Sequence, residues 1–122
     1  MPAEAQVRAS IATATQAASR ADSRGVVAPL SDDFDGNAGE LDRRTLANMI
    51  RVAHLRGEHV GVTVGPITIE HRGERMVATF TLALTSGGRL FPDQMGVHRV
   101  ETAWRQEHGK WLCYSASWQR AM

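Results

Sequence analysis

The C-terminal part of the chain alternates between apolar and polar residues on both sides of one glycine. Residues 97–107 and 110–120 follow a period of two, which is typical of β-strands, and His108-Gly109 between them favours a hairpin turn. Side chains directly opposite in an antiparallel pair share a face, so the turn fixes a register. The predicted pairs are Glu107 with Lys110, Trp104 with Cys113, Ala103 with Tyr114, Glu101 with Ala116 and Arg99 with Trp118.

This register gives the hairpin two faces of different character. One face is apolar and aromatic and carries Val100, Thr102, Trp104, Trp111, Cys113, Ser115 and Ser117. The other mixes charge with aromatic surface and carries Arg99, Glu101, Ala103, Arg105, Leu112, Tyr114, Ala116 and Trp118. Such a mixture suits the wall of a binding pocket, so we interpret the second face as the inner one.

Three helices are predicted before the strands. Residues 3–21 are rich in alanine, which favours helix, and their apolar stripe is Val7, Ile11, Ala14 and Ala18. Asp22 is the expected N-cap of a short second helix that ends before Pro29. Asp42 is the expected N-cap of a third helix through Arg56, which Gly57 stops. The third helix is expected to bury Leu46, Met49, Ile50 and Ala53.

The segment 31–40 is dense in turn-forming residues and carries the carboxylates of Asp32, Asp33 and Asp35. A calcium loop needs oxygen ligands at fixed offsets and a closing glutamate, and this spacing does not supply them. The five histidines also lack metal-ligand spacing. We therefore predict an acidic turn here and no metal site.

The strands before the hairpin are predicted from the same period of two. Residues 60–70 alternate, but Gly65-Pro66 interrupts them, so this strand is expected at an edge or with a bulge. Residues 76–84 form a half-buried strand, and residues 85–96 are long enough to fold back over an opening. The predicted fold is α+β, one domain over residues 1–122, with three helices packed on one face of a curved antiparallel sheet of at least four strands.

The composition of the chain argues against several classes of function. The net charge is +1, from 14 Lys plus Arg and 13 Asp plus Glu, which gives no electrostatic footprint for nucleic acid. No apolar run is long enough for a membrane span, and no cofactor motif is present. The single Cys113 is expected to pack in the core. The cytoplasm is the default compartment, and a trimmed periplasmic or exported form fits the start of the chain as well.

The order of elements, with Ala18 to Asp22, Leu30 to Phe34 and Gly109-Lys110-Trp111, resembles the nuclear transport factor 2-like superfamily. That superfamily includes ketosteroid isomerases, scytalone dehydratases and SnoaL-like polyketide cyclases. The resemblance implies a cone-shaped, cystatin-like α+β roll with a hydrophobic pocket between the helices and the sheet.

The comparison with ketosteroid isomerase implies a pocket position for part of the hairpin. Tyr114, Ala116 and Trp118 match the cavity residues of that enzyme's last strand, and Glu101 matches its carboxylic oxyanion-hole donor. Its tyrosine would fall near Ala14 and its aspartate base near Asn37 or Ala38, so neither group is present. The resemblance therefore implies the pocket and not the isomerase activity.

Glu101 is the candidate catalytic residue. Enclosure by Tyr114, Trp118 and Phe80 would remove water from its carboxyl and favour the protonated form that a general acid needs. The alternative is an ion pair with Arg99 or Arg105 on the same face. The candidate ligand-binding residues are Tyr114, Trp118, Arg99, Phe80, Met49 and His54, although Tyr114 could instead satisfy a backbone carbonyl and His54 could cap its helix.

Two functions remain at this point. In the first, the chain is a small-molecule-binding domain without a standard catalytic set, and the missing phenol and base favour it. In the second, it is an isomerase, lyase or cyclase that acts on a small hydrophobic substrate with Glu101 as acid or base. The apolar face of the hairpin predicts a homodimer through the sheet, unless the first helix covers that face and leaves a monomer.

Overall fold

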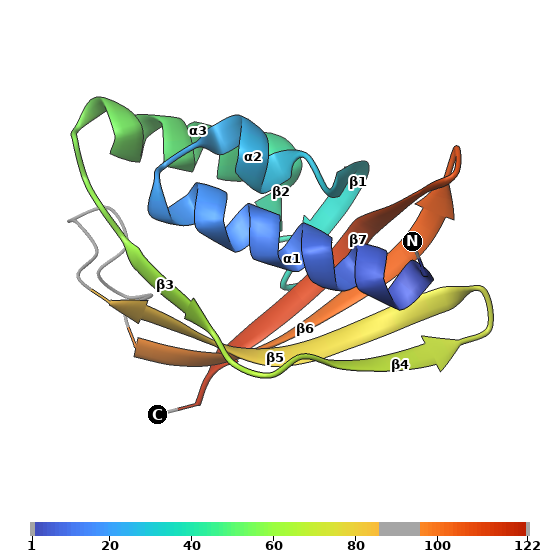
Figure 1. The fold of residues 1–122 in the computed structure, drawn as a ribbon. Coiled ribbons are helices and arrows are strands. Elements are labelled where there is room, and N and C mark those ends of the chain that lie inside the picture. Colours follow the sequence, from blue (N-terminus) through green and yellow to red (C-terminus); the bar gives the residue numbers. More distant parts are fainter. Residues whose placement is uncertain (1, 86–95, 122) are drawn as a thin grey trace.

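The computed structural model describes residues 2–85 and 96–121, and Figure 1 shows three helices on one side of a curved sheet. The helices are α1 (Ala3–Ser19), α2 (Ser23–Val27) and α3 (Arg43–Leu55). The strands are β1 (Leu30–Gly36), β2 (Leu41–Asp42), β3 (Gly61–Val64), β4 (Thr68–Arg72), β5 (Arg75–Thr85), β6 (Gly96–Glu107) and β7 (Lys110–Arg120). The predicted α+β class is confirmed. The predicted connection of residues 85–96 falls largely outside the described residues.

The predicted helix caps are confirmed. The Asp22 carboxylate accepts a hydrogen bond from the backbone N–H of Gly25, and that of Asp42 accepts one from Thr45 at 2.7 Å. The bond from Thr45 lowers the pKa of Asp42 because it stabilises the ionised carboxylate. After α3, Gly57 adopts a φ of +66°, a conformation that favours glycine and ends the helix.

The acidic segment is the main error in the predicted order of elements. Residues 30–42 form β1, a turn and β2, and β1 pairs in parallel with β7, so the sheet is mixed. Ser31, Phe34 and Gly36 are buried along β1, which therefore carries part of the core despite its carboxylates. Within the described residues the strand order is β2-β1-β7-β6-β5-β3, and β4 also pairs with β5.

The interruption at Gly65-Pro66 is confirmed, because the predicted strand over residues 60–70 divides into β3 and β4. Both strands pair with β5, and the N–H of Gly65 donates to the carbonyl of Thr81 at 3.0 Å.

The register of the final hairpin agrees with the prediction only next to the turn. Glu107 pairs with Lys110 and Trp104 with Cys113 as predicted, but Ala103 then pairs with Ser115. Tyr114 is the extra residue of a β-bulge, so every later residue of β7 changes face. Trp118 consequently lies opposite Val100, and Ser117 lies opposite Glu101.

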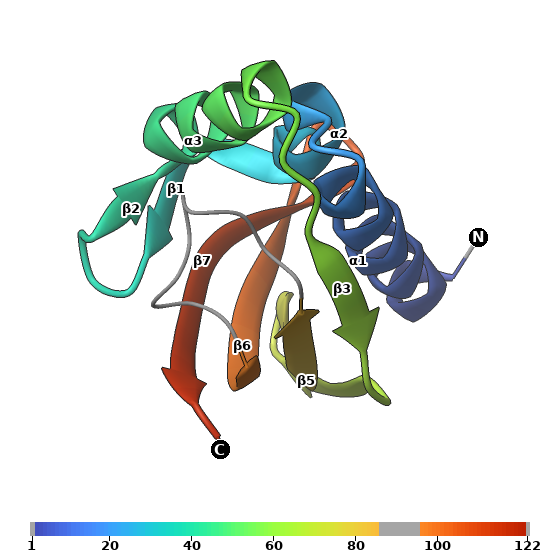
Figure 2. The same cartoon turned by 90° about the vertical axis from the view of Figure 1, so that its left-hand side faces the viewer.

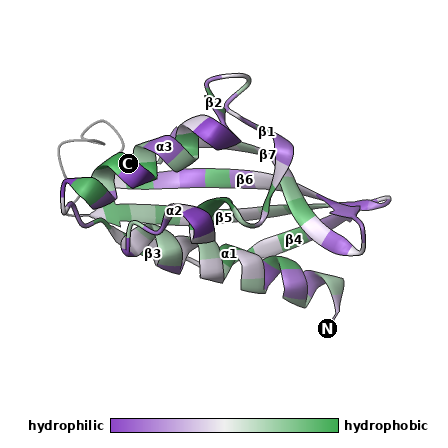
Figure 3. Cartoon of the chain, turned by 90° about the horizontal axis from the view of Figure 1, so that it is seen from above, coloured by the Kyte–Doolittle hydropathy of each residue, from purple (hydrophilic) through white to green (hydrophobic). Residues whose placement is uncertain are grey.

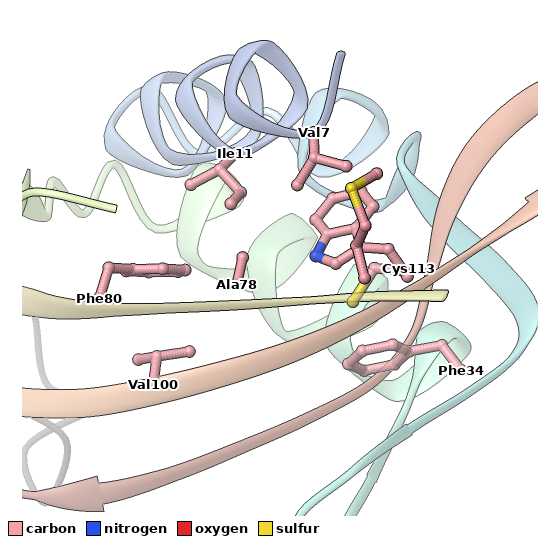
Figure 4. Packing of buried hydrophobic residues seen from close by; sticks show 9 residues of the cluster. Val7, Ile11, Phe34, Ala78, Phe80, Val100 and Cys113 are labelled. Atoms are coloured by element: carbon pink, nitrogen blue, oxygen red, sulfur yellow. The ribbon is translucent and has the colours of Figure 1, made fainter. Parts of the chain in front are cut away.

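The core lies between α1 and the concave face of the sheet, as Figure 4 shows. Val7 and Ile11 of α1 pack against a cluster from the strands that comprises Phe34, Met76, Ala78, Phe80, Val100, Trp104 and Cys113. The residues of β6 that face the helices are thus Val100, Thr102 and Trp104, the face that sequence analysis placed outside.

Candidate functional site

The concave face of the sheet is filled at one end. Met76, Trp104 and Cys113 lie in one row across β5, β6 and β7 and are at most 2% exposed. The same row packs beneath Val7 of α1, which has no exposed surface. We call this row the closed end. The Trp104 indole donates to the Thr102 hydroxyl at 2.8 Å, and that hydroxyl donates to the Ala78 carbonyl. The polar groups at the closed end are therefore satisfied within the chain.

The described residues cover the opposite end of the concave face only partly. Leu82 of β5 and Trp118 of β7 face the helices there, and both remain half-buried. The facing stripe of α3 shows the same pattern, because Leu46 and Met49 are half-buried while Ile50 and Ala53 are buried. Figure 2 shows α3 above the sheet. We use the name open end for the half-buried apolar residues Leu82 and Trp118 of the sheet together with Leu46 and Met49 of α3. Large apolar side chains on the inner faces of both layers thus keep contact with solvent.

Trp118 is held in place by the turn after β1. Its backbone N–H donates to the Asn37 side-chain oxygen at 2.9 Å, and the Asn37 amide nitrogen donates to its carbonyl at 3.4 Å. A Cβ atom at Gly36 would lie 2.8 Å from the Cη2 atom of Trp118, so only glycine leaves room for the indole ring there. The sequence does not predict this packing, because Gly36-Asn37 is a turn signal that gives no indication of contact with β7.

His98, and not His54, is the histidine of the concave face. The His98 side chain is 5% exposed and lies in register with Leu82 at the open end. His54 is exposed on α3, so the prediction that it looks into the cavity is wrong. The period of two in β6 could have identified His98, since it continues the series Val100, Thr102 and Trp104.

Glu101 lies on the convex face, which corrects its predicted enclosure. The residue is exposed and lines a polar concavity of about 300 Å³ with Thr79, Arg99 and Ser117. Trp118 borders the same concavity, although its ring lies on the other face against Gly36. The predicted shared pocket with Phe80 and the third helix is therefore not formed, and the physical reason is that β6 presents its even-numbered residues to the helices.

The predicted ion pairs of Glu101 are also absent among the residues that the structure describes. Arg105 donates instead to Asp33 at 2.7 Å and to Glu107 at 2.8 Å. The hydrogen bond from Arg105, with a second one from Ser31, lowers the pKa of Asp33. These bonds connect β6 to β1 on the convex face of the sheet, behind the closed end.

Tyr114 is part of the same convex network. The guanidinium groups of Arg75 and Arg105 lie 5.0 and 4.9 Å from the centre of its ring, and Arg75 donates to its hydroxyl at 3.1 Å. Such cation–π contacts stabilise the bulge and leave Tyr114 away from the concave face. The predicted pocket role of Tyr114 is therefore not supported by its position, whereas Phe80 is buried in the core and Met49 lies at the open end.

The remaining chemistry of the site is limited. Burial raises the pKa of the Cys113 thiol to about 12, which keeps it protonated and unreactive at neutral pH. The described residues hold no group of three His, Cys, Asp or Glu side chains arranged for a metal ion. Within the same residues, no helix has the length and apolar character needed to cross a membrane.

Most of the predicted dimer surface is buried within the chain. Val100, Thr102, Trp104 and Cys113 are all less than 9% exposed, and Trp111 is half-buried against the core cluster, which includes Val7 and Ile11 of α1. The first helix covers this face, as in the alternative prediction. The residues are therefore not available for the predicted contact between copies.

Neither a profile of a known protein family nor a curated protein matches the sequence. Solved structures do match the fold. A nuclear transport factor 2-like protein from Cytophaga hutchinsonii superposes with a TM-score of 0.80 at 15% identity, covering 98% of this chain and 99% of its own. One of unknown function from Pseudomonas putida gives 0.73 at 19% identity, with 98% and 88% covered. A third, with a cystatin-like fold, from Novosphingobium aromaticivorans gives 0.74 at 15%, with 98% and 82% covered.

The chain has the nuclear transport factor 2-like fold. The likeness confirms the fold implied by the resemblance, and identities of this size carry no activity across. The resemblance put the tyrosine of ketosteroid isomerase near Ala14 and its base near Asn37 or Ala38. The Asn37 amide is bonded to the backbone of Trp118, so this side chain supports β7.

Proposed function

We propose that the protein binds a small, largely apolar molecule at the open end of the concave face. The supporting observation is that Leu82 and Trp118 on the concave face, and Leu46 and Met49 on α3, are apolar and stay half-buried. Protein interiors are close-packed, so apolar side chains on facing layers normally exclude solvent. A ligand between the layers would bury this surface, and the buried His98 would supply a polar group to orient it.

The binding function is favoured over an enzyme that uses Glu101. Catalysis at the open end would need an acid or base within hydrogen-bond reach of the bound molecule. Glu101 lies on the opposite face of β6, beside Arg99 and Ser117. The sheet itself separates this carboxylate from the proposed ligand.

Native mass spectrometry of the purified protein, followed by titration with the amphiphilic dye anilinonaphthalene sulfonate, whose aromatic rings are apolar, tests this function. Trp118→Ala should weaken dye binding about 10- to 100-fold, because a large apolar side chain contributes about 1.5–3 kcal/mol of apolar contact. Trp118→Phe should recover most of the affinity. Glu101→Gln should leave it unchanged, and a loss as large as that of Trp118→Ala would place the ligand on the convex face instead.

We also propose that the protein forms a homodimer through the convex face of β5, β6 and β7. Figure 1 shows no helix on this side of the sheet. Arg99 and Glu101 are exposed two positions apart on β6, and neither forms an ion pair within the described chain. A two-fold axis would bring Arg99 of each copy to Glu101 of the other, which makes the surface complementary to itself.

Sedimentation of charge variants tests the dimer. Arg99→Glu and Glu101→Arg each place like charges across the two-fold axis, so each should dissociate the dimer. The double variant Arg99→Glu with Glu101→Arg restores opposite charges and should dimerise again. A wild type that sediments as a monomer at micromolar concentration, or single variants that dimerise equally well, would contradict the proposal.

A further inference from the structure

A second concavity lies on the helical side, away from the open end. It has a volume of about 420 Å³ and is lined by residues of β1 and α3, namely Asp32, Arg43, Arg44, Ala47, Asn48 and Arg51. Figure 3 colours the end of α3 next to β2 as hydrophilic, in agreement with this lining. Three arginine residues therefore line one concavity.

None of these three arginines forms an ion pair with a described carboxylate. The four ion pairs of the described chain involve Glu4, Glu70, Asp33 and Glu107 with other partners. Arg105, for comparison, is bonded to two carboxylates at once. The positive charge that Arg43, Arg44 and Arg51 bring to the concavity is opposed by Asp32 on its wall, and the Asp42 carboxylate also interacts electrostatically with Arg44.

The cluster also places positive charge at the N-terminal end of α3. Arg43 and Arg44 open α3, where the helix dipole favours negative charge, and the first turn contains no acidic residue. The capping carboxylate of Asp42 is bonded to the N–H of Thr45. A bound anion would offset the repulsion among the three guanidinium groups.

Two of the arginines are held in place by neutral groups. Arg43 donates from Nε to the carbonyl of Val27 at 3.3 Å, and Arg51 donates from Nη1 to the side-chain oxygen of Asn48 at 2.7 Å. A guanidinium carries five N–H donors, so each keeps four for another acceptor. Side chains already fixed lose less conformational entropy when they bind a ligand.

We infer that this concavity binds the phosphate monoester of a small hydroxylated molecule. Arginine forks match the geometry of phosphate oxygens, and bonds between a guanidinium and a phosphate are charge-assisted. The Asp32 carboxylate accepts hydrogen bonds only, so it would receive a ligand hydroxyl and repel a second phosphate. This site lies on other residues than the proposed apolar site and stands independently of it.

Calorimetric titration with glycerol phosphate, glycerol and inorganic phosphate tests the inference. Glycerol phosphate should bind saturably, inorganic phosphate more weakly, and glycerol not at all. Arg51→Gln and Arg44→Gln should each weaken glycerol phosphate about tenfold, the usual cost of one charge-assisted bond. Arg56→Gln removes the same charge from α3 outside the concavity and serves as the matched control.

Substitution of the acidic wall tests the hydroxyl contact separately. Asp32→Asn should strengthen the binding of inorganic phosphate and reduce the preference for glycerol phosphate over it. Circular dichroism confirms that each variant is folded. The inference is overturned if neither phosphate compound binds at millimolar concentration, if Arg56→Gln weakens binding as much as Arg51→Gln, or if inorganic phosphate and glycerol phosphate bind equally.

Discussion

The two ends of one concave sheet face differ in how completely they are covered. At the closed end, Met76, Trp104 and Cys113 lie under α1 and are at most 2% exposed. At the open end, Leu82 and Trp118 lie toward α3 and stay half-buried, although they belong to the same strands. The same alternating pattern therefore builds a core at one end and a candidate ligand surface at the other. The covering helix, and not the strand sequence, determines which.

The largest expected effect is a difference in stability loss between substitutions at the two ends. Trp104→Ala should lower the free energy of unfolding by about 3–5 kcal/mol, because it leaves a cavity in a close-packed region. Trp118→Ala should cost about 1–2 kcal/mol, since the half-buried ring contributes less apolar contact. Urea denaturation measures both values. Equal losses would show that the open end is packed like the closed end.

The hairpin also shows how far the sequence alone predicts this fold. Its turn at His108-Gly109 and the Trp104–Cys113 pair follow from alternation and from turn chemistry. The bulge at Tyr114 has no local signal, because its contacts with Arg75 and Arg105 come from elsewhere in the sheet. One extra residue in β7 moved Trp118 to the concave face and left Glu101 on the convex one. Glu101 and Trp118, which were predicted to share one pocket, therefore lie on opposite faces of the sheet.

The other error, in the acidic segment, has a similar cause. Turn-forming residues were read correctly near Asn37 and Gly39, where φ is positive. The burial of Phe34 and Ser31 in β1 depends on a parallel neighbour, β7, that is distant in the sequence. Helix caps, in contrast, depend on residues a few positions apart, and both predicted caps are confirmed. The predicted stripe of α1 is confirmed at Val7 and Ile11, whereas Ala17 is buried and the predicted Ala14 and Ala18 are only half-buried.

The next effect concerns the support of Trp118. Gly36→Ala should cost about 1–3 kcal/mol, because the added methyl group forces the indole ring to move. The fluorescence of the displaced Trp118 should shift as well. Gly39→Ala is the control, since Gly39 has a φ of +96° but no atom within 4 Å of an added Cβ. Urea unfolding and tryptophan emission spectra measure these effects. Equal spectral shifts in Gly36→Ala and Gly39→Ala would contradict the account.

A smaller effect is expected on stability in acid, through the Asp33–Arg105 contact on the convex face. The pKa of Asp33 lies below its ordinary value of 3.8 because Arg105 and Ser31 donate to the carboxylate. A depressed pKa stabilises the folded state above the unfolded value, and this contribution disappears as the pH falls through the folded value. Asp33→Asn should lower stability at neutral pH and reduce the further loss in acid. Thermal unfolding across the acid range measures this. The contact is refuted if the unfolding temperatures of wild type and variant fall in parallel as the pH is lowered.

The smallest expected change is in thiol reactivity. Cys113 is buried with a pKa of about 12, so it should resist alkylation at about pH 8 until the protein unfolds. A variant with Leu82→Cys and Cys113→Ser carries its only thiol at the open end and should react without unfolding. Mass spectrometry after timed alkylation measures both rates. Similar rates for the two thiols would remove the distinction between the ends.

The central claim is that a small apolar molecule binds at the open end. The three tryptophans give three indole N–H signals in a proton–nitrogen correlation spectrum, which single Trp→Phe variants assign. Titration with anilinonaphthalene sulfonate should move the Trp118 signal saturably and leave that of Trp104 in place. A saturable shift of the Trp104 or Trp111 signal with Trp118 unmoved, or no saturable shift at all, would contradict the claim.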